Sequence, residues 1–427
     1  MSASDPKSWF GPLPGHPEAR VVSWIVLGAA LIGSVFSLVR GFQGQTFLGR
    51  PLGGDFVQFY TVGRILNQYP PERIYDLDLE VRLQHEFAAG TDRDQILVFG
   101  SAPYVGLVFR PFARLSYAPA YLAWLAFSLV LYSAGVLLLL GAAPYPAPLK
   151  TTGFLLAVSF TPFLIESWIG GQISVLAFFA MAAFVFCRSR RRRFVAGLAL
   201  ALALFKPTLI AIPILMLLCG RRWRMLAGVV VGAAALALTS IAMVGIKGCE
   251  AWLEALRLYG RLATGPAAAL RRTKYVDIGS FVQLLCGTGP LTRVLAVVGA
   301  IAGVAMLAIA WMRSASWNAP SRDLLWAATL AAALVCNVYT PIYDTILVVP
   351  AVALAAGVTL TRSADREALG GRLVLIYVVP WVTQLLAEFL RFQPLTLVLG
   401  GFAWWALSVA RRDAGGEAYV NGHRAHE

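Results

Sequence analysis

One acidic residue, Asp55, stands where a long apolar run meets a polar loop. It belongs to the stretch GGDFVQFYTVGRILNQYPPERIYD, residues 53–76, which follows the first run long enough to cross a membrane. A carboxylate at such a boundary is costly unless the protein uses it, and it can accept the proton of an attacking hydroxyl group. Asp55 is therefore our candidate general base. The competing interpretation is structural: Asp55 would cap the helix that begins at Phe56.

Cations that could hold a phosphate group form the second set of candidates. Lys206 lies inside an apolar segment, where a lysine costs roughly 2.5–3.5 kcal/mol on insertion scales. It is therefore either a phosphate-binding residue or a lysine whose ammonium reaches the membrane interface. The alternative phosphate-binding set, Arg271, Arg272 and Lys274, lies in a basic stretch at 247–290. That stretch could instead only contact anionic lipid headgroups.

Further polar residues complete the candidate site and are expected to contact substrate: Tyr60, Gln172, Tyr343 and Asp344. A diglycine, Gly53-Gly54, precedes Asp55, and a second one, Gly170-Gly171, precedes Gln172. Because glycine lets a backbone approach another group closely, we expect both diglycines to lie against a ligand.

The chemistry is narrowed by the motifs that the sequence lacks. No group of His or Cys residues has metal-ligand spacing, and no Gly-rich nucleotide-binding loop occurs, so neither a metal nor a cofactor is expected. A carboxylate that accepts a proton and cations that hold a phosphate remain. Glycosyl transfer from a lipid phosphate donor needs little more.

The elements that must position these residues are membrane helices. Of 427 residues, 58% are hydrophobic and 14% are charged, which leaves too little polar surface for a soluble protein. The net charge of +14 does not indicate a nucleic-acid partner, because the basic residues lie in short breaks between apolar runs. The sequence predicts an all-α polytopic membrane protein of about 12 (10–13) transmembrane helices. The predicted helices span 21–40, 118–141, 151–166, 173–187, 194–218, 225–246, 291–312, 323–337, 345–360, 372–388 and 395–410.

Basic clusters predict the orientation of the chain. The run RSRRRR at 188–193 should be cytoplasmic by the positive-inside rule. The segment 194–218 has basic clusters on both sides, yet two full crossings need roughly 40 residues. A short hairpin with Lys206-Pro207 at its tip keeps both clusters in the cytoplasm, because proline breaks a helix. Asp55 and the other candidate residues then share the outer face.

One transmembrane domain follows from this orientation, with both termini in the cytoplasm. We expect a cytoplasmic segment at 1–20, the transmembrane domain at 21–410 and a cytoplasmic tail at 411–427. Two outer loops interrupt the domain: a long first loop at 43–115, which carries amphipathic helices, and the basic loop at 247–290.

Several stretches together resemble a known family. The run GGDFVQFYTVGRIL…RIYD resembles the first outer loop of polyprenol-phosphate-mannose-dependent mannosyltransferases of glycosyltransferase family 87, in the glycosyltransferase-C superfamily. Four further stretches agree in order and spacing: FGSAPYVGLVFRPFARLSYAPAYLAW, GGQISVL, AGLALALALFKPTLIAIPILMLLCGRRWR and NVYTPIYDTILVVPA. The resemblance covers most of residues 50–351.

The resemblance implies an inverting transferase with a glycosyltransferase-C-like bundle. It would take a sugar, usually mannose, from a polyprenyl-phosphate donor on the extracytoplasmic face of a bacterial plasma membrane. The acceptor would be a glycolipid or a lipid-linked glycan, and neither metal nor sugar nucleotide would be needed. Asp55 matches the family's loop aspartate, which acts as general base. Some relatives carry histidine in the late outer loop, where this chain has Tyr343 and Asp344.

Two other function classes remain as alternatives. A transporter or lipid flippase would also have broken helices and intramembrane charges, but it should show paired inverted repeats, and the two halves show no internal symmetry. A polymerase or ligase acting on a diphosphate-linked oligosaccharide would use arginines in a large late outer loop, which the 247–290 stretch resembles weakly. The Asp55 motif directly after the first helix disfavours both.

Overall fold

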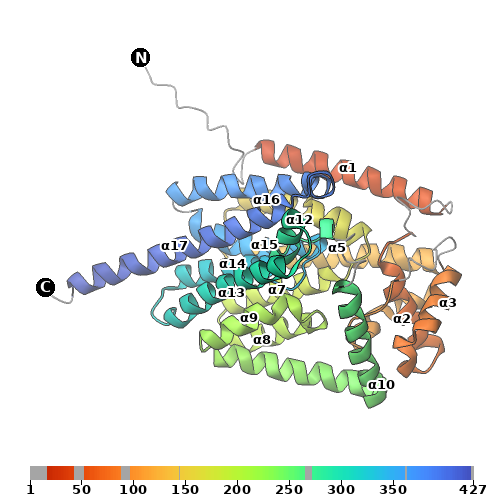
Figure 1. Ribbon diagram of the computed structural model, residues 1–427. Helices are drawn as coiled ribbons and strands as arrows, with labels where there is room; N and C mark the ends of the chain where they lie inside the picture. The colour runs from red at the N-terminus through yellow and green to blue at the C-terminus, as the bar shows by residue number, and fades with distance from the viewer. Residues whose placement is uncertain are drawn as a thin grey trace.

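The computed structural model describes residues 17–42, 52–87, 97–143, 145–264, 272–360 and 363–424, which fold mainly into helices (Figure 1). Among these residues, six helical stretches are long and apolar enough to cross a membrane. They are α5 (Tyr117–Ala142), α10 (Trp223–Thr264), α13 (Pro290–Arg313), η7 with α15 (Ile342–Leu347 and Val348–Thr359), α16 (Ser363–Leu390) and α17 (Pro394–Arg424). The predicted all-α polytopic membrane protein is therefore confirmed, while the number of crossings stays a prediction.

Two helices with long buried faces each pack against several others. The first, α14 (Ala319–Val335), is buried along most of its length and packs against α15, α17 and α9 (Thr208–Cys219). The second, α7 (Ser174–Ser189), packs between α5 and α8 (Arg193–Ala201). The helix α1 (Pro17–Phe42) lies on the outside of the bundle against α6 (Ala147–Val158) (Figure 1).

One predicted helix, 151–166, is bent in the structure. Its first part belongs to α6, and the second is the π-helical η4 (Pro162–Ile169), tilted by 48°. Proline at 162 lacks an N–H donor and cannot continue the α-helical hydrogen bonding. The wider π turn is closed by Gly170 N, which donates to Ile165 O at 3.1 Å.

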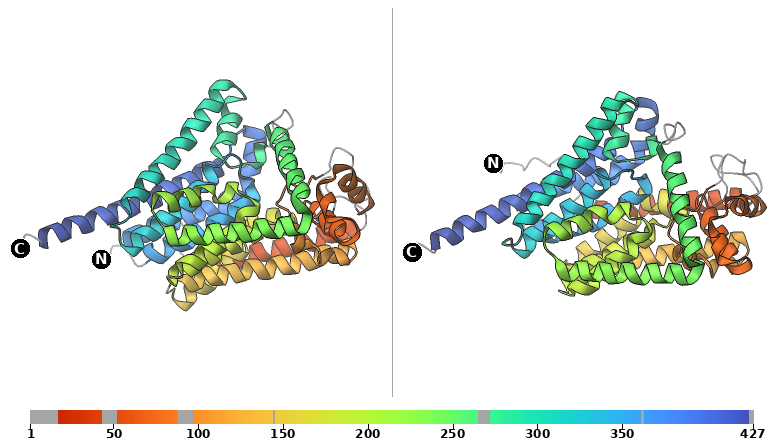
Figure 2. Two further views of the ribbon diagram at one scale, coloured as in Figure 1. Left: turned by 90° about the horizontal axis from the view of Figure 1, so that it is seen from below. Right: turned by 60° about the horizontal axis from the view of Figure 1, so that its bottom comes forward.

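A group of short helices occupies one end of the bundle, in the described part of the predicted first outer loop (Figure 2). Aromatic packing fixes this group to α5, because the fully buried Phe56 lies 5.5 Å from the ring of Tyr121 and 6.3 Å from that of Trp124. The carboxylate of Glu80, also buried, accepts a hydrogen bond from Phe99 N at 3.0 Å. The helices are α2 (Phe56–Gln68), η1 (Pro71–Tyr75), α3 (Leu77–Phe87), α4 (Val105–Phe109) and η3 (Phe112–Arg114).

The segment after α7 forms the predicted hairpin. The helix α8 continues into η5 (Leu202–Phe205), and the chain returns through α9. Close glycine contacts show that α8 and α10 run in the same direction: a Cβ at Gly228 would meet Phe194 O at 2.1 Å, and one at Gly232 would meet the Cβ of Ala201. The chain must therefore reverse at Lys206-Pro207 to reach the start of α10. Arg222 directly precedes α10 and Arg193 begins α8, so the parallel packing brings them near each other. Burial, followed by the positive charges of neighbouring arginines, Arg193 among them, lowers the pKa of Arg222.

The segment labelled α10 consists of two helices that join at Gly245, next to the predicted helix end at residue 246. Its backbone turns at Gly245, whose φ of +67° suits glycine, and the second part packs against η1 (Figures 1 and 2). There Trp252 Nε1 donates to Gly100 O at 3.3 Å. The described part of the predicted outer loop at 247–290 consists mostly of helix, namely the end of α10, η6 (Arg272–Lys274) and α12 (Ile278–Cys286); its outward orientation stays a prediction.

Thiol labelling of intact cells tests the predicted orientation. Gln68, Ser189 and Ser316 are exposed, so a cysteine at each can react with a membrane-impermeant maleimide in a Cys286→Ser background, which removes an exposed native thiol. We expect Gln68→Cys to react in intact cells, and Ser189→Cys and Ser316→Cys to react only after permeabilisation. Reaction of Ser189→Cys in intact cells would overturn the orientation.

Candidate active site

The two diglycine turns contact each other. A Cβ at Gly171 would lie 2.3 Å from Gly53 O, and one at Gly54 would lie 2.9 Å from Gly170 O. Gly53, Gly54 and Gly171 all have positive φ, of 85°, 52° and 66°. The expectation that both diglycines approach a ligand was therefore wrong, because the space beside each one is filled by the backbone of the other.

This contact brings Asp55 to Gln172. The amide N–H of Asp55 donates to Gly170 O at 3.0 Å, and Gln172 Nε2 donates to the Asp55 carboxylate. Asp55 does precede α2, but its side chain makes no capping hydrogen bond. The half-buried carboxylate of Asp55 is therefore oriented by a neutral amide from another part of the chain, and the capping interpretation is not supported.

Two residues further along, Ser174 binds a buried ion pair. Ser174 Oγ donates to Asp344 Oδ1 at 2.6 Å, and the Lys206 ammonium pairs with Asp344 Oδ2. The Asp344 side chain is fully buried and that of Lys206 is 16% exposed. Lys206 also lies over the ring of Tyr343, 4.8 Å from its centroid. The hairpin tip, the start of α7 and η7 thus meet at one carboxylate.

A short backbone pairing brings the alternative cation set to the same end of the bundle. Val276 N donates to Thr340 O at 2.8 Å, and Tyr275 forms an antiparallel bridge with Pro341. This pairing holds η6, with half-buried Arg272 and Lys274, next to the start of η7. Arg271, the third member of the set, lies outside the described residues.

Not every predicted residue joins this group. Tyr60 is 1% exposed, and its hydroxyl donates to Leu115 O at 2.8 Å, so it belongs to the aromatic core beneath α2. Ser174 was missed by the sequence reasoning, because a serine at the start of a helix is ordinary in type and its partner is 170 residues away. The contact between Gln384 and Glu166 was missed as well, because these residues are also far apart in the sequence; Gln384 Nε2 donates to the Glu166 carboxylate at 2.8 Å.

The residues from Gly170 to Ser174, called here the 170–174 connection, therefore fix two carboxylates. Gln172 holds Asp55 and Ser174 holds Asp344. Backbone atoms two residues apart are separated by at most about 7 Å. The arrangement can supply a proton acceptor at Asp55 and ammonium donors at Lys206, joined through the two ends of this connection.

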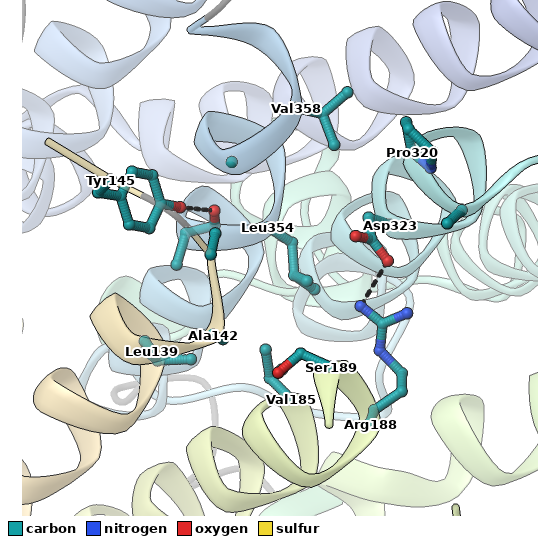
Figure 3. A pocket seen from close by; sticks show the side chains of 14 residues that line it. Leu139, Ala142, Tyr145, Val185, Arg188, Ser189, Pro320, Asp323, Leu354 and Val358 are labelled. Carbon is teal, nitrogen blue, oxygen red and sulfur yellow. Dashed lines mark hydrogen bonds and ion pairs between the residues drawn. The ribbon is translucent and has the colours of Figure 1, made fainter. Parts of the chain in front are cut away.

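A cavity of about 300 Å³ lies elsewhere in the bundle, between α5, α7, α14 and α15 (Figure 3). In Figure 3 the Arg188 guanidinium points toward Asp323, and the ion-pair distance is 2.6 Å. Tyr145 donates to the carbonyl of Ala353 on another wall. Since Arg188 lies in the last turn of α7 and Ser174 begins that helix, this cavity is separated from the Asp55 group by the length of α7.

The Lys206–Asp344 pair should show the signature of a buried ion pair. Lys206→Met leaves the Asp344 carboxylate buried without its cation, which typically costs about 3–5 kcal/mol. Lys206→Met/Asp344→Asn removes both charges and should recover much of that loss. Thermal unfolding of the purified variants in one detergent measures both effects. A double variant as unstable as Lys206→Met alone would contradict the assignment.

Comparison with known proteins gives one match. The model of glycosyltransferase family 87 matches residues 102–350. No curated protein matches the chain, and neither does any solved structure. The matched region contains Gln172, Ser174, Lys206 and Asp344, while Asp55 precedes it and joins them through Gln172. Because the match covers more than half of the 427 residues, this membrane protein belongs to glycosyltransferase family 87.

Proposed function

We propose that this glycosyltransferase moves mannose from a polyprenyl-phosphate donor to a glycolipid or lipid-linked glycan. The transfer inverts the anomeric centre and takes place at the extracytoplasmic face of a bacterial plasma membrane, with Asp55 as the general base. The observation that carries this proposal is the pairing of the Asp55 carboxylate with Gln172 instead of with its own helix.

The surroundings of Asp55 suit a general base. Asp55 is half-buried, and Gln172, which is 6% exposed, orients its carboxylate. The Gln172 side-chain amide that fixes the carboxylate carries no charge of its own. Geometry of this kind is the first requirement for proton transfer, before the acid–base strength of the group.

The reaction needs one proton acceptor and one stabilised leaving group. The acceptor oxygen forms a bond to the anomeric carbon, and the bond from that carbon to the phosphate oxygen breaks. The hydroxyl proton passes to Asp55, and the bonding electron pair leaves with polyprenyl phosphate, which gains one negative charge. Because inversion places the incoming and leaving oxygens on opposite faces of the sugar, the base and the phosphate-binding cation must flank the ring.

Lys206, together with Arg272 and Lys274, supports the proposed binding of the leaving phosphate. Negative charge grows on the leaving phosphate, and fixed donors stabilise it most in the transition state. Lys206 with Asp344 carries no net charge, so Lys206 contributes N–H donors, of which an ammonium has three. Arg272 and Lys274, held nearby by the bridge to Pro341, contribute positive charge.

Replacing Asp55 with asparagine tests the proposed base. Asp55→Asn keeps the size of the side chain and removes its capacity to accept the proton, so turnover should fall by about 10²–10⁴-fold. The assay follows transfer from labelled polyprenyl-phosphate mannose to a total membrane lipid extract. The melting temperature should change little.

Asp76 provides the matched control. Its carboxylate caps α3 by accepting from Leu79 N at 3.1 Å, a role that asparagine also fills. Asp76→Asn should therefore transfer sugar at the wild-type rate. Transfer by Asp55→Asn at that same rate would refute the role of Asp55.

A further inference from the structure

We infer that Ser174 is a positioning residue, which holds the proton acceptor and the phosphate-binding cation at a fixed separation through the 170–174 connection. This inference rests on the proposed function, since it assigns a role to Ser174 only if Asp55 and Lys206 act on the same sugar. Ser174 contacts neither reacting group directly; it acts through the buried carboxylate of Asp344.

The contacts form one continuous chain between base and cation. Gln172 binds Asp55 at one end of the connection. At the other end Ser174 binds one oxygen of Asp344, whose second oxygen binds Lys206. Within the described residues, Ser174 is 1% exposed and Asp344 is 0% exposed. Water therefore cannot easily replace the Ser174–Asp344 hydrogen bond if the hydroxyl is removed.

The N-terminal end of the 170–174 connection is held in place by close backbone packing and by a hydrogen bond. Gly171 packs against Gly53 and Phe56, where a Cβ would lie 2.3–2.8 Å from their atoms. Tyr121 Oη donates to Ile169 O at 2.6 Å. Both η4 and α7 pack against η7, and the Ser174 hydroxyl adds the hydrogen bond that joins this anchored segment to the Asp344 carboxylate, and thereby to the hairpin tip at Lys206.

Removal of the Ser174 hydroxyl should therefore affect turnover more than donor binding. The Lys206–Asp344 pair survives in Ser174→Ala, so KM for polyprenyl-phosphate mannose should stay unchanged. Without the Ser174–Asp344 hydrogen bond the distance between the base and the cation is no longer fixed. Misplacement of reacting groups slows the chemical step. We expect kcat to fall by about tenfold or more, the effect of one hydrogen bond to a charged group. Ser174→Thr, which keeps the hydroxyl, should recover most of the rate.

Ser167 offers a matched control within the same part of the chain. It is also 1% exposed, but its hydroxyl has no hydrogen-bond partner among the residues that the structure describes. Ser167→Ala makes the same chemical change without breaking a contact, so its kcat should equal that of the wild type. Thermal unfolding of both alanine variants separates a loss of rate from a loss of folded protein.

The combined results distinguish the inference from the function on which it rests. If Asp55→Asn is inactive and Ser174→Ala turns over like Ser167→Ala, the role of Ser174 is refuted while the proposed base stands. If Asp55→Asn stays active, the proposed function fails and the inference falls with it. A double-mutant cycle of Gln172→Ala and Ser174→Ala adds an independent readout: residues acting through one connection should show non-additive losses of kcat, and additive losses would overturn the inference.

Discussion

Two backbone turns approach so closely that no side chain fits between them, and the candidate active site depends on this contact. Gly53-Gly54 precedes Asp55, and Gly170-Gly171 precedes Gln172, so packing one turn on the other brings a carboxylate to an amide 117 residues away. The three positive φ angles at these positions suit glycine and strain other residues. A side chain at either turn would separate Asp55 from Gln172 without touching any reacting atom.

The polar groups of the site lie where regular helix is interrupted. Gln172 follows the π-helical η4, Lys206 lies between η5 and Pro207, and Asp344 lies in η7. Inside a membrane protein, backbone freed by such breaks must find partners within the protein, and the same breaks expose side chains that a continuous helix would direct toward lipid or neighbouring helices. The buried pair between Lys206 and Asp344 then joins two of these breaks. Structural and chemical roles are in this way carried by the same few residues.

The sequence was sufficient for features that depend on local patterns. Apolar length and basic clusters predicted the helical bundle and the hairpin at Lys206-Pro207, because lipid thickness and charge orientation act on short stretches. The sequence did not predict the contacts between segments that are distant along the chain. Asp344 is 138 residues from Lys206, and nothing in either neighbourhood identifies the partner. The diglycines were assigned to a ligand, since their permissive backbone is the same whether the approaching group is a substrate or another turn. The break at Gly245 lies next to the predicted helix end at residue 246, but the helix that follows it was not predicted.

The central claim, that the reacting sugar lies between Asp55 and Lys206, is tested most directly by a structure with the donor bound. A cryo-electron microscopy structure of Asp55→Asn with polyprenyl-phosphate mannose would locate the anomeric carbon. We predict that this carbon lies between the side chains at positions 55 and 206, with the phosphate on the Lys206 side and the polyprenyl chain in lipid. A sugar bound away from the 170–174 connection, for example in the cavity beside Arg188 and Asp323, would contradict it.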